Sequence, residues 1–108
     1  MSGGTNAAIR IAEVHNQLDP GDVARALRRW SAHAHGPIRR LAGSCSPAAM
    51  HGCPCASRAL LERVVNRLGG RPRREVRRLI DDIDRVFLDR THPDPRMPGE
   101  WPWWMRRC

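Results

Sequence analysis

Apolar side chains recur every three or four residues in the segment 72–90, and this pattern is the strongest constraint on the fold. The apolar positions are Val76, Leu79, Ile80, Ile83, Val86 and Phe87. Side chains at these intervals share one face of an α-helix, and that face must be buried against other elements. Pro72 suits the first helical turn, where its missing N–H would have no intrahelical partner. The segment therefore predicts an amphipathic helix that packs inside a bundle.

Three earlier segments also have helical spacing, and residues that end helices separate them. The first is 7–18, with Ala7, Ile11, Val14 and Leu18 at helical spacing. The second runs from 20 to about 35, with Val23, Leu27, Trp30 and Ala34. The third is 55–68, with Leu60, Leu61, Val64, Val65 and Leu68. Asp19 is expected to cap the second helix, and Gly36 with Pro37 to end it. No segment alternates with the period of a strand. The predicted fold is all-α, a small bundle of about four helices.

The chain length and the proline distribution define the domain organisation. A chain of 108 residues with 41% hydrophobic residues suits one globular domain. We expect a flexible N-terminus (1–6), a single helical domain (7–90) and an extended Pro/Trp-rich tail (91–108) packed on it. A Cys/His-rich loop precedes the third helix, with single turns expected at 38–42 and 46–51. No stretch is long and apolar enough for a membrane span, and no signal peptide is recognisable, so we expect a soluble, cytoplasmic protein.

The charged residues are strongly unbalanced. The formal net charge is +8, and all 19 basic residues are arginine. Arginine in place of lysine is typical of a GC-rich genome and suggests a bacterial origin. The guanidinium group also binds phosphate and carboxylate through two parallel hydrogen bonds. A nucleic acid or an acidic protein is therefore the expected partner, and no membrane surface is expected.

Seven arginines are concentrated at the end of the third helix and the start of the fourth, and we call this set the arginine edge. They are Arg63, Arg67, Arg71, Arg73, Arg74, Arg77 and Arg78, with Glu75 as the one acid among them. Such an edge could lie on a phosphate backbone or on an acidic protein. Alternatively, i,i+4 pairs could form a solvated face, at Arg77–Asp81, Arg78–Asp82, Asp81–Arg85 and Arg85–Asp89. No base-reading motif is present, so sequence-specific binding is not predicted.

Four soft or borderline metal ligands crowd into eleven residues of the loop: Cys45, His51, Cys53 and Cys55. Zinc prefers four such groups in a tetrahedron, and a helix N-terminus at Cys55 would favour its thiolate. The single-residue spacing is unusual for zinc, so Cys108 could replace Cys45 as a ligand. Another metal centre, redox or disulfide chemistry, and simple burial of the cysteines stay open. The leading expectation is a structural zinc site, which the metal content of the purified chain would test.

The tail concentrates most of the aromatic residues. Trp101, Trp103 and Trp104 lie within four residues, and the chain contains no tyrosine and one phenylalanine. The tail could fold back and insert tryptophans between helices, or it could present them to a partner as interface anchors.

Together these features predict a small, zinc-stabilised, non-enzymatic binding protein that associates with nucleic acid through its arginines, with a regulatory role. The alternative is a protein-interaction adaptor or inhibitor for an acidic partner. A thiol or metal-dependent enzyme ranks third, because no carboxylate lies near the Cys/His cluster to act as a base.

Overall fold

The computed structural model of the chain describes residues 3–36, 54–91, 99–100 and 102–104. These residues form four α-helices and no strand: α1 (Gly3–His15), α2 (Asp22–His35), α4 (Pro54–Arg67) and α5 (Gly70–Arg90). The prediction of an all-α fold with about four helices is therefore confirmed. The turns expected at 38–42 and 46–51 lie outside the described residues.

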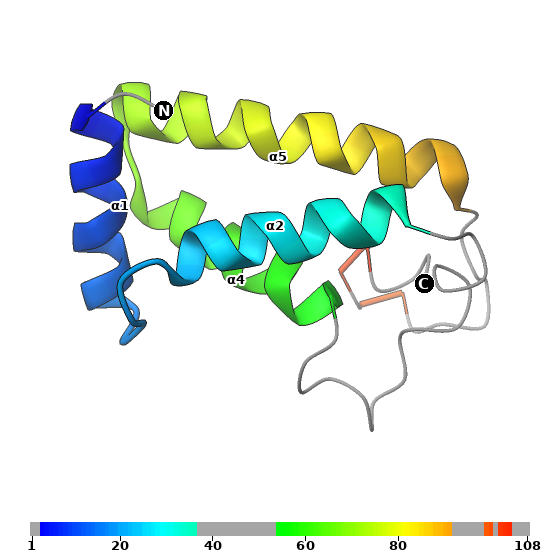
Figure 1. The fold of residues 1–108 in the computed structure, drawn as a ribbon, viewed down its shortest axis with the longest axis horizontal. Helices are drawn as coiled ribbons and strands as arrows, with labels where there is room; N and C mark the ends of the chain where they lie inside the picture. Colours follow the sequence, from blue (N-terminus) through cyan, green and yellow to red (C-terminus); the bar gives the residue numbers. More distant parts are fainter. Residues whose placement is uncertain (1–2, 37–53, 92–98, 101, 105–108) are drawn as a thin grey trace.

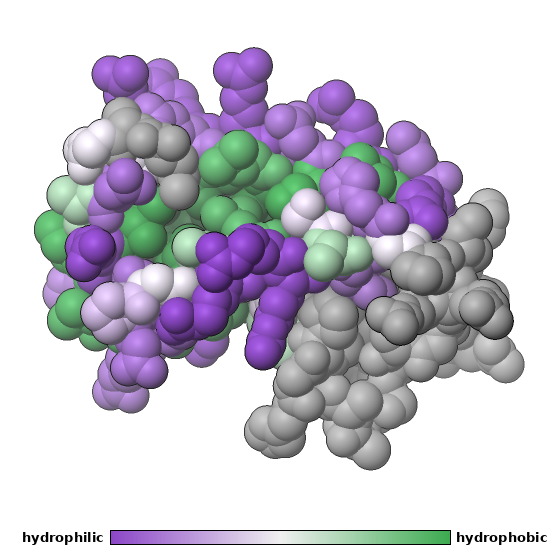
Figure 2. Space-filling model, viewed as in Figure 1, coloured by the Kyte–Doolittle hydropathy of each residue, from purple (hydrophilic) through white to green (hydrophobic). Residues whose placement is uncertain are grey.

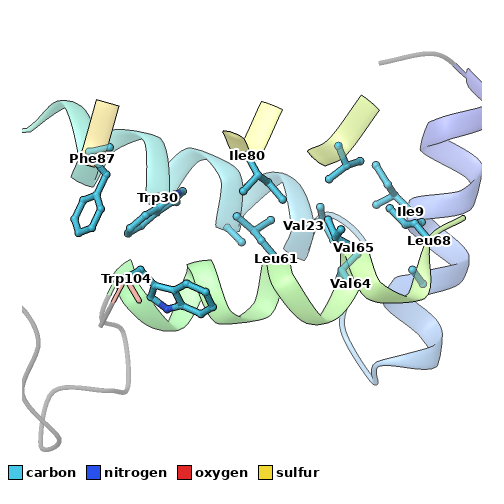
Figure 3. Packing of buried hydrophobic residues seen from close by; sticks show 14 residues of the cluster. Ile9, Val23, Trp30, Leu61, Val64, Val65, Leu68, Ile80, Phe87 and Trp104 are labelled. Carbon is cyan, nitrogen blue, oxygen red and sulfur yellow. The ribbon is translucent and has the colours of Figure 1, made fainter. Parts of the chain in front are cut away.

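Helices α2 and α5 lie side by side along the molecule, and α4 packs beneath α2, while α1 stands across one end (Figure 1). The hydrophobic core is formed where the apolar stripes of α2, α4 and α5 meet (Figure 3). Its fully buried members include Trp30, Leu61, Val65, Ile80 and Phe87. The stripes predicted for the last two helices thus face the core, except that Leu79 is 40% exposed.

Helix α1 differs from its prediction in both its start and its buried face. It begins at Gly3 rather than residue 7, so Gly3–Asn6 belong to a helix and not to an irregular start. The predicted inward residues Ile11 and Val14 are 60% and 73% exposed, whereas Ile9 and Ala12 are buried. The segment carries apolar residues on two adjacent faces, and periodicity alone could not choose between them.

Two polar contacts explain which face of α1 is turned inward. The Thr5 hydroxyl donates to Glu75 Oε2 at 2.6 Å, and the buried Glu13 carboxylate accepts the Val23 N–H at 3.0 Å. Val23 lies in the first turn of α2, where backbone N–H groups lack intrahelical partners and the helix dipole favours a negative charge. Glu13 therefore stabilises the start of α2 from a neighbouring helix.

The connection between α1 and α2 also differs from the prediction at Asp19. The Asp19 side chain does not cap α2. Instead Asp22 Oδ2 accepts the Asp19 N–H at 2.8 Å, and Gly21 is the residue before the helix. Gly21 has φ of 90°, which glycine adopts without the steric cost that a Cβ brings. The side chain that closes the turn therefore belongs to Asp22, inside the helix, and not to Asp19, which precedes it.

Two arginines of α5 bind the carbonyl groups at the C-terminal ends of the other long helices. Arg73 donates to the carbonyl oxygens of Val65 and Asn66 in α4, and Arg90 donates to that of Ala34 in α2. The last carbonyls of a helix have no intrahelical donors and carry partial negative charge. These contacts fix both ends of α5 to the bundle. Within the described ranges, no helix is long and apolar enough to cross a membrane.

Candidate functional site

The arginine edge lies where α4 ends and α5 begins, next to α1 (Figure 1). Three of its arginines are occupied by contacts within the protein. Arg71 pairs with Glu75 at 3.1 Å, Arg73 binds the end of α4, and Arg77 donates to both carboxylate oxygens of Glu62 at 3.2 and 3.3 Å. Part of the arginine edge therefore has a structural role.

The remaining arginines of the edge are directed to solvent. Arg63 and Arg67 lie one turn apart on α4, and Arg74 and Arg78 lie one turn apart on α5. All four are exposed, and within the described ranges no hydrogen bond or ion pair joins their side chains to another residue. Figure 2 shows hydrophilic side chains projecting along the outer side of α5. These four guanidinium groups are available to an external anion.

The four i,i+4 pairs expected for a solvated face do not form in α5, although Arg71 and Glu75 make another pair of this spacing. The helix is described along its whole length, and none of the four expected pairs forms in it. Arg77 turns toward Glu62 of α4 instead of Asp81. Glu62 is only partly exposed, and an ion pair screened less by water is stronger.

A set of paired charges adjoins the arginine edge, and we call Arg58, Glu62, Arg77 and Asp84 the ion cluster. Arg58 and Asp84 are buried in it, whereas Glu62 and Arg77 are partly exposed. Arg58 is 2% exposed and binds Asp84 in a bidentate manner, with two N–H···O distances of 2.9 Å. It also donates to Glu62 at 2.8 Å, while Trp30 Nε1 donates to Asp84 at 2.9 Å. The two positive and two negative groups balance, and three helices contribute to the cluster and its tryptophan partner.

The pKa values in the ion cluster reflect its balance of burial and hydrogen bonding. Burial by itself would lower the pKa of Arg58, but hydrogen bonds to Asp84 and Glu62 outweigh it and leave the pKa raised. Burial would raise the pKa of Glu62, yet hydrogen bonds from Arg58 and Arg77 leave it below its usual value. Both groups are therefore charged at neutral pH, as a buried ion pair requires.

Two tail tryptophans cover this cluster. The Arg58 guanidinium lies 4.5 Å from the ring centre of Trp104 and 5.7 Å from that of Trp103. Trp104 is 6% exposed, and Trp103 is half-buried against Phe87. A cation over an aromatic face is attracted by the negative π-surface, and the rings also exclude water from the ion pair. Trp104 is thus a core residue here rather than an exposed anchor. Trp101 lies outside the described residues.

Sequence reasoning missed Arg58 and Asp84, although a signal was present. Arg58 lies one turn before Leu61 on the apolar stripe of α4, and Asp84 lies one turn after Ile80 on that of α5. Opposite charges at core positions of two packed helices are the pattern of a buried ion pair, because a lone buried charge is too costly. The pattern was hidden among the many other arginines and aspartates of the chain.

The predicted metal ligands fall outside the part of the chain whose side chains the structure describes. Cys45, His51, Cys53 and Cys108 lie outside the described residues, as does the side chain of Cys55, although its backbone lies in the first turn of α4. Among the residues whose side chains are described, no group of three or more His, Cys, Asp or Glu could hold a metal ion. The zinc site stays a prediction from the sequence.

A shallow hollow of about 500 Å³ lies beside the ion cluster. Arg77 and Arg85 line it together with Asp81 and Trp103, so its walls carry both signs of charge. This mixture gives the hollow no clear preference for an anion, in contrast to the exposed arginines near the start of α5.

Comparison with family models, with curated proteins and with solved structures found no match for this chain.

Proposed function

We propose that this protein is a small, non-enzymatic binding protein that holds the phosphate backbone of a nucleic acid with Arg63, Arg67, Arg74 and Arg78. The observation that carries the proposal is the exposure of these four arginines, without intramolecular partners among the described residues, at the α4–α5 junction. Arginine binds phosphate strongly and without regard to base sequence. The structural zinc predicted at the Cys/His cluster would stabilise this domain and take no part in binding.

The position of Arg74 and Arg78 on α5 supports the proposal. They lie in the second and third turns of the helix, and no acid occupies the first turn. A phosphate group bound by these guanidinium groups would meet no carboxylate in the first turn of the helix.

The charge distribution along α5 limits the contact to one end of the helix. After Arg78 the exposed side of α5 carries Asp81, Asp82 and Asp89 against Arg85. A polyanion would be repelled by this acidic half and held at the basic half. We therefore expect a short, backbone-directed contact with weak sequence preference, rather than docking of all of α5 into a groove.

Salt-dependent binding tests the proposal. Fluorescence anisotropy would measure the dissociation constant for labelled duplex DNA of about 20 base pairs, and for RNA of the same length, at several salt concentrations. The affinity should fall steeply with salt. The double variant Arg74→Ala/Arg78→Ala should bind more weakly and reduce the slope of log K against log salt by about 2.

A matched control separates a defined site from general charge attraction. Arg28 and Arg29 are exposed on α2, so Arg28→Ala/Arg29→Ala removes the same charge from another helix. This control should keep most of the affinity and of the salt slope. Equal losses in both variants would show that only net charge matters, and no loss in the α5 variant would refute the proposed site.

A further inference from the structure

Helix α1 exposes an apolar stripe that the rest of the described protein does not cover. Ile11 is 60% exposed and Val14, one turn further along, is 73% exposed. Single exposed apolar residues are ordinary on protein surfaces. Two large ones at i,i+3 spacing on a 13-residue helix form a continuous stripe. Figure 2 shows hydrophobic residues reaching the surface at the α1 end of the molecule.

A groove runs beside this stripe between α1 and the end of α4. It has a volume of about 340 Å³. Ile11 and Ala12 form part of one wall and Leu68 part of the other, so the groove has an apolar strip on both sides, next to the polar side chains of His15 and Arg67. Ala12 and Leu68 are themselves almost buried and therefore hold the groove in a fixed shape. An apolar groove with a rigid lining next to an exposed helix can receive the side chains of another helix.

The charged side chains at the groove and on the exposed side of α1 are arginines. Arg67 and His15 line it, and Arg10 is exposed on the same helix. The one acid of α1, Glu13, is 2% exposed and is turned inward to the Val23 N–H. The exposed side of α1, which is described throughout, therefore presents apolar and basic groups and no carboxylate. This combination is complementary to an apolar surface with acidic flanks.

We propose that this groove and the Ile11–Val14 stripe form a docking surface for an acidic amphipathic helix of another protein. Leucine-type side chains at i, i+3 and i+4 spacing would fill the groove, and a flanking carboxylate would pair with Arg67. A second copy of the chain fits less well, because each copy carries a net charge of +8 and brings Arg10 and Arg67 to the contact. The surface is separate from Arg74 and Arg78, although Arg67 borders both.

Binding of a defined peptide tests this surface. The probe is an N-acetylated, fluorescein-labelled peptide of about 18 residues, with leucines at helical spacing and glutamate or alanine elsewhere. Its counterpart has lysine in place of every glutamate. In anisotropy at physiological salt, the glutamate peptide should bind and the lysine peptide should not. The variant Ile11→Ser/Val14→Ser should weaken binding at least about tenfold without changing the charge of the protein.

The matched control is Leu79→Ser/Leu88→Ser, which changes two leucines of α5 that are 40% and 42% exposed. It should leave peptide binding unchanged, and thermal melting would show that both variants are folded. Arg67→Glu is the second test, independent of apolar contacts: it should lose the glutamate peptide and gain the lysine peptide. Nuclear magnetic resonance should place the shifted amide signals on α1 and at Leu68 and Gly69.

Three outcomes would overturn the proposal. The glutamate peptide fails to bind, or the Ile11→Ser/Val14→Ser variant binds it as tightly as the parent does. The third outcome is that sedimentation shows the parent protein as a dimer and the Ile11→Ser/Val14→Ser variant as a monomer. That result would assign the surface to a second copy of the chain. Loss of DNA binding alone would leave the docking surface intact, because the peptide contact does not depend on Arg74 and Arg78.

Discussion

Arginine occurs in two contrasting settings at the two ends of the α4–α5 pair. Arg58 is buried, bound to Asp84 and Glu62, and covered by the rings of Trp103 and Trp104. Arg74 and Arg78 are exposed on α5 and bind no other described residue. The same side chain is thus fully satisfied within the fold at one end and left for an external anion at the other.

This difference shows that arginine content alone does not measure a binding surface. Of the arginine edge, Arg73 and Arg77 serve the fold by binding the end of α4 and Glu62. The charge available to a partner is therefore smaller than the sequence suggests, and it is located more narrowly. The buried and exposed groups should differ most clearly in their effect on the stability of the protein.

The largest expected effect is the loss of Asp84. Asp84→Ala would leave Arg58 buried without its main partner and would remove the acceptor of Trp30 Nε1. Removing one partner of a buried ion pair costs about 3–5 kcal/mol. Urea unfolding should show a loss of this size.

The exposed Asp81 provides the control, since Asp81→Ala should change stability by no more than about 0.5 kcal/mol. Replacing both buried charges, with Arg58→Met and Asp84→Leu together, should recover much of the loss. If Asp84→Ala unfolds at the same urea concentration as the parent, the buried pair does not stabilise the fold as described here.

Acidification should have an intermediate effect on the stability of the protein, because it protonates Glu62. Hydrogen bonds from Arg58 and Arg77 overcome its burial and hold its pKa below the usual value of 4.5. A carboxyl group with a lowered folded pKa stabilises the protein above its unfolded pKa, and this contribution is lost as the pH falls through the folded pKa. The free energy of unfolding should therefore fall with acidification below about pH 4.5.

Glu62→Gln removes the titrating group and should show a shallower fall over this range. The variant should be less stable than the parent at neutral pH, and the two stability curves should approach each other at low pH. Chemical unfolding at a series of pH values provides the measurement. Parallel curves for the two proteins would argue against a role of Glu62 in acid sensitivity.

The smallest effect is expected at the exposed end of α5. Arg74→Ala/Arg78→Ala should change the free energy of unfolding by less than about 0.5 kcal/mol, because both side chains are exposed and bind no other described residue. Arg73→Ala should cost more, because it removes the hydrogen bonds that Arg73 donates to the Val65 and Asn66 carbonyls at the end of α4. A larger loss from the double variant than from Arg73→Ala would mean that Arg74 and Arg78 support the fold.

The sequence predicted best where one helix face was clearly apolar. In the segment 55–68 the apolar stripe left one choice of buried face. The structure buries Leu61, Val64, Val65 and Leu68 and half-buries Leu60. In α1 the competing stripes of Ile9 and Ile11 were nearly equivalent in pattern. The choice between them depended on Thr5 binding Glu75 and on Glu13 reaching α2, contacts between residues that are distant in the sequence.

By itself the sequence determined the helices and the basic character of the chain. Helix formation depends on spacing, proline and glycine, which are local properties. Only the tertiary structure decided which arginines are available. Arg58 and Arg78 have the same chemistry, but Asp84 and Trp104 surround the first, and solvent surrounds the second. A buried charge requires partners from other parts of the chain, so its role appears only when the helices have packed.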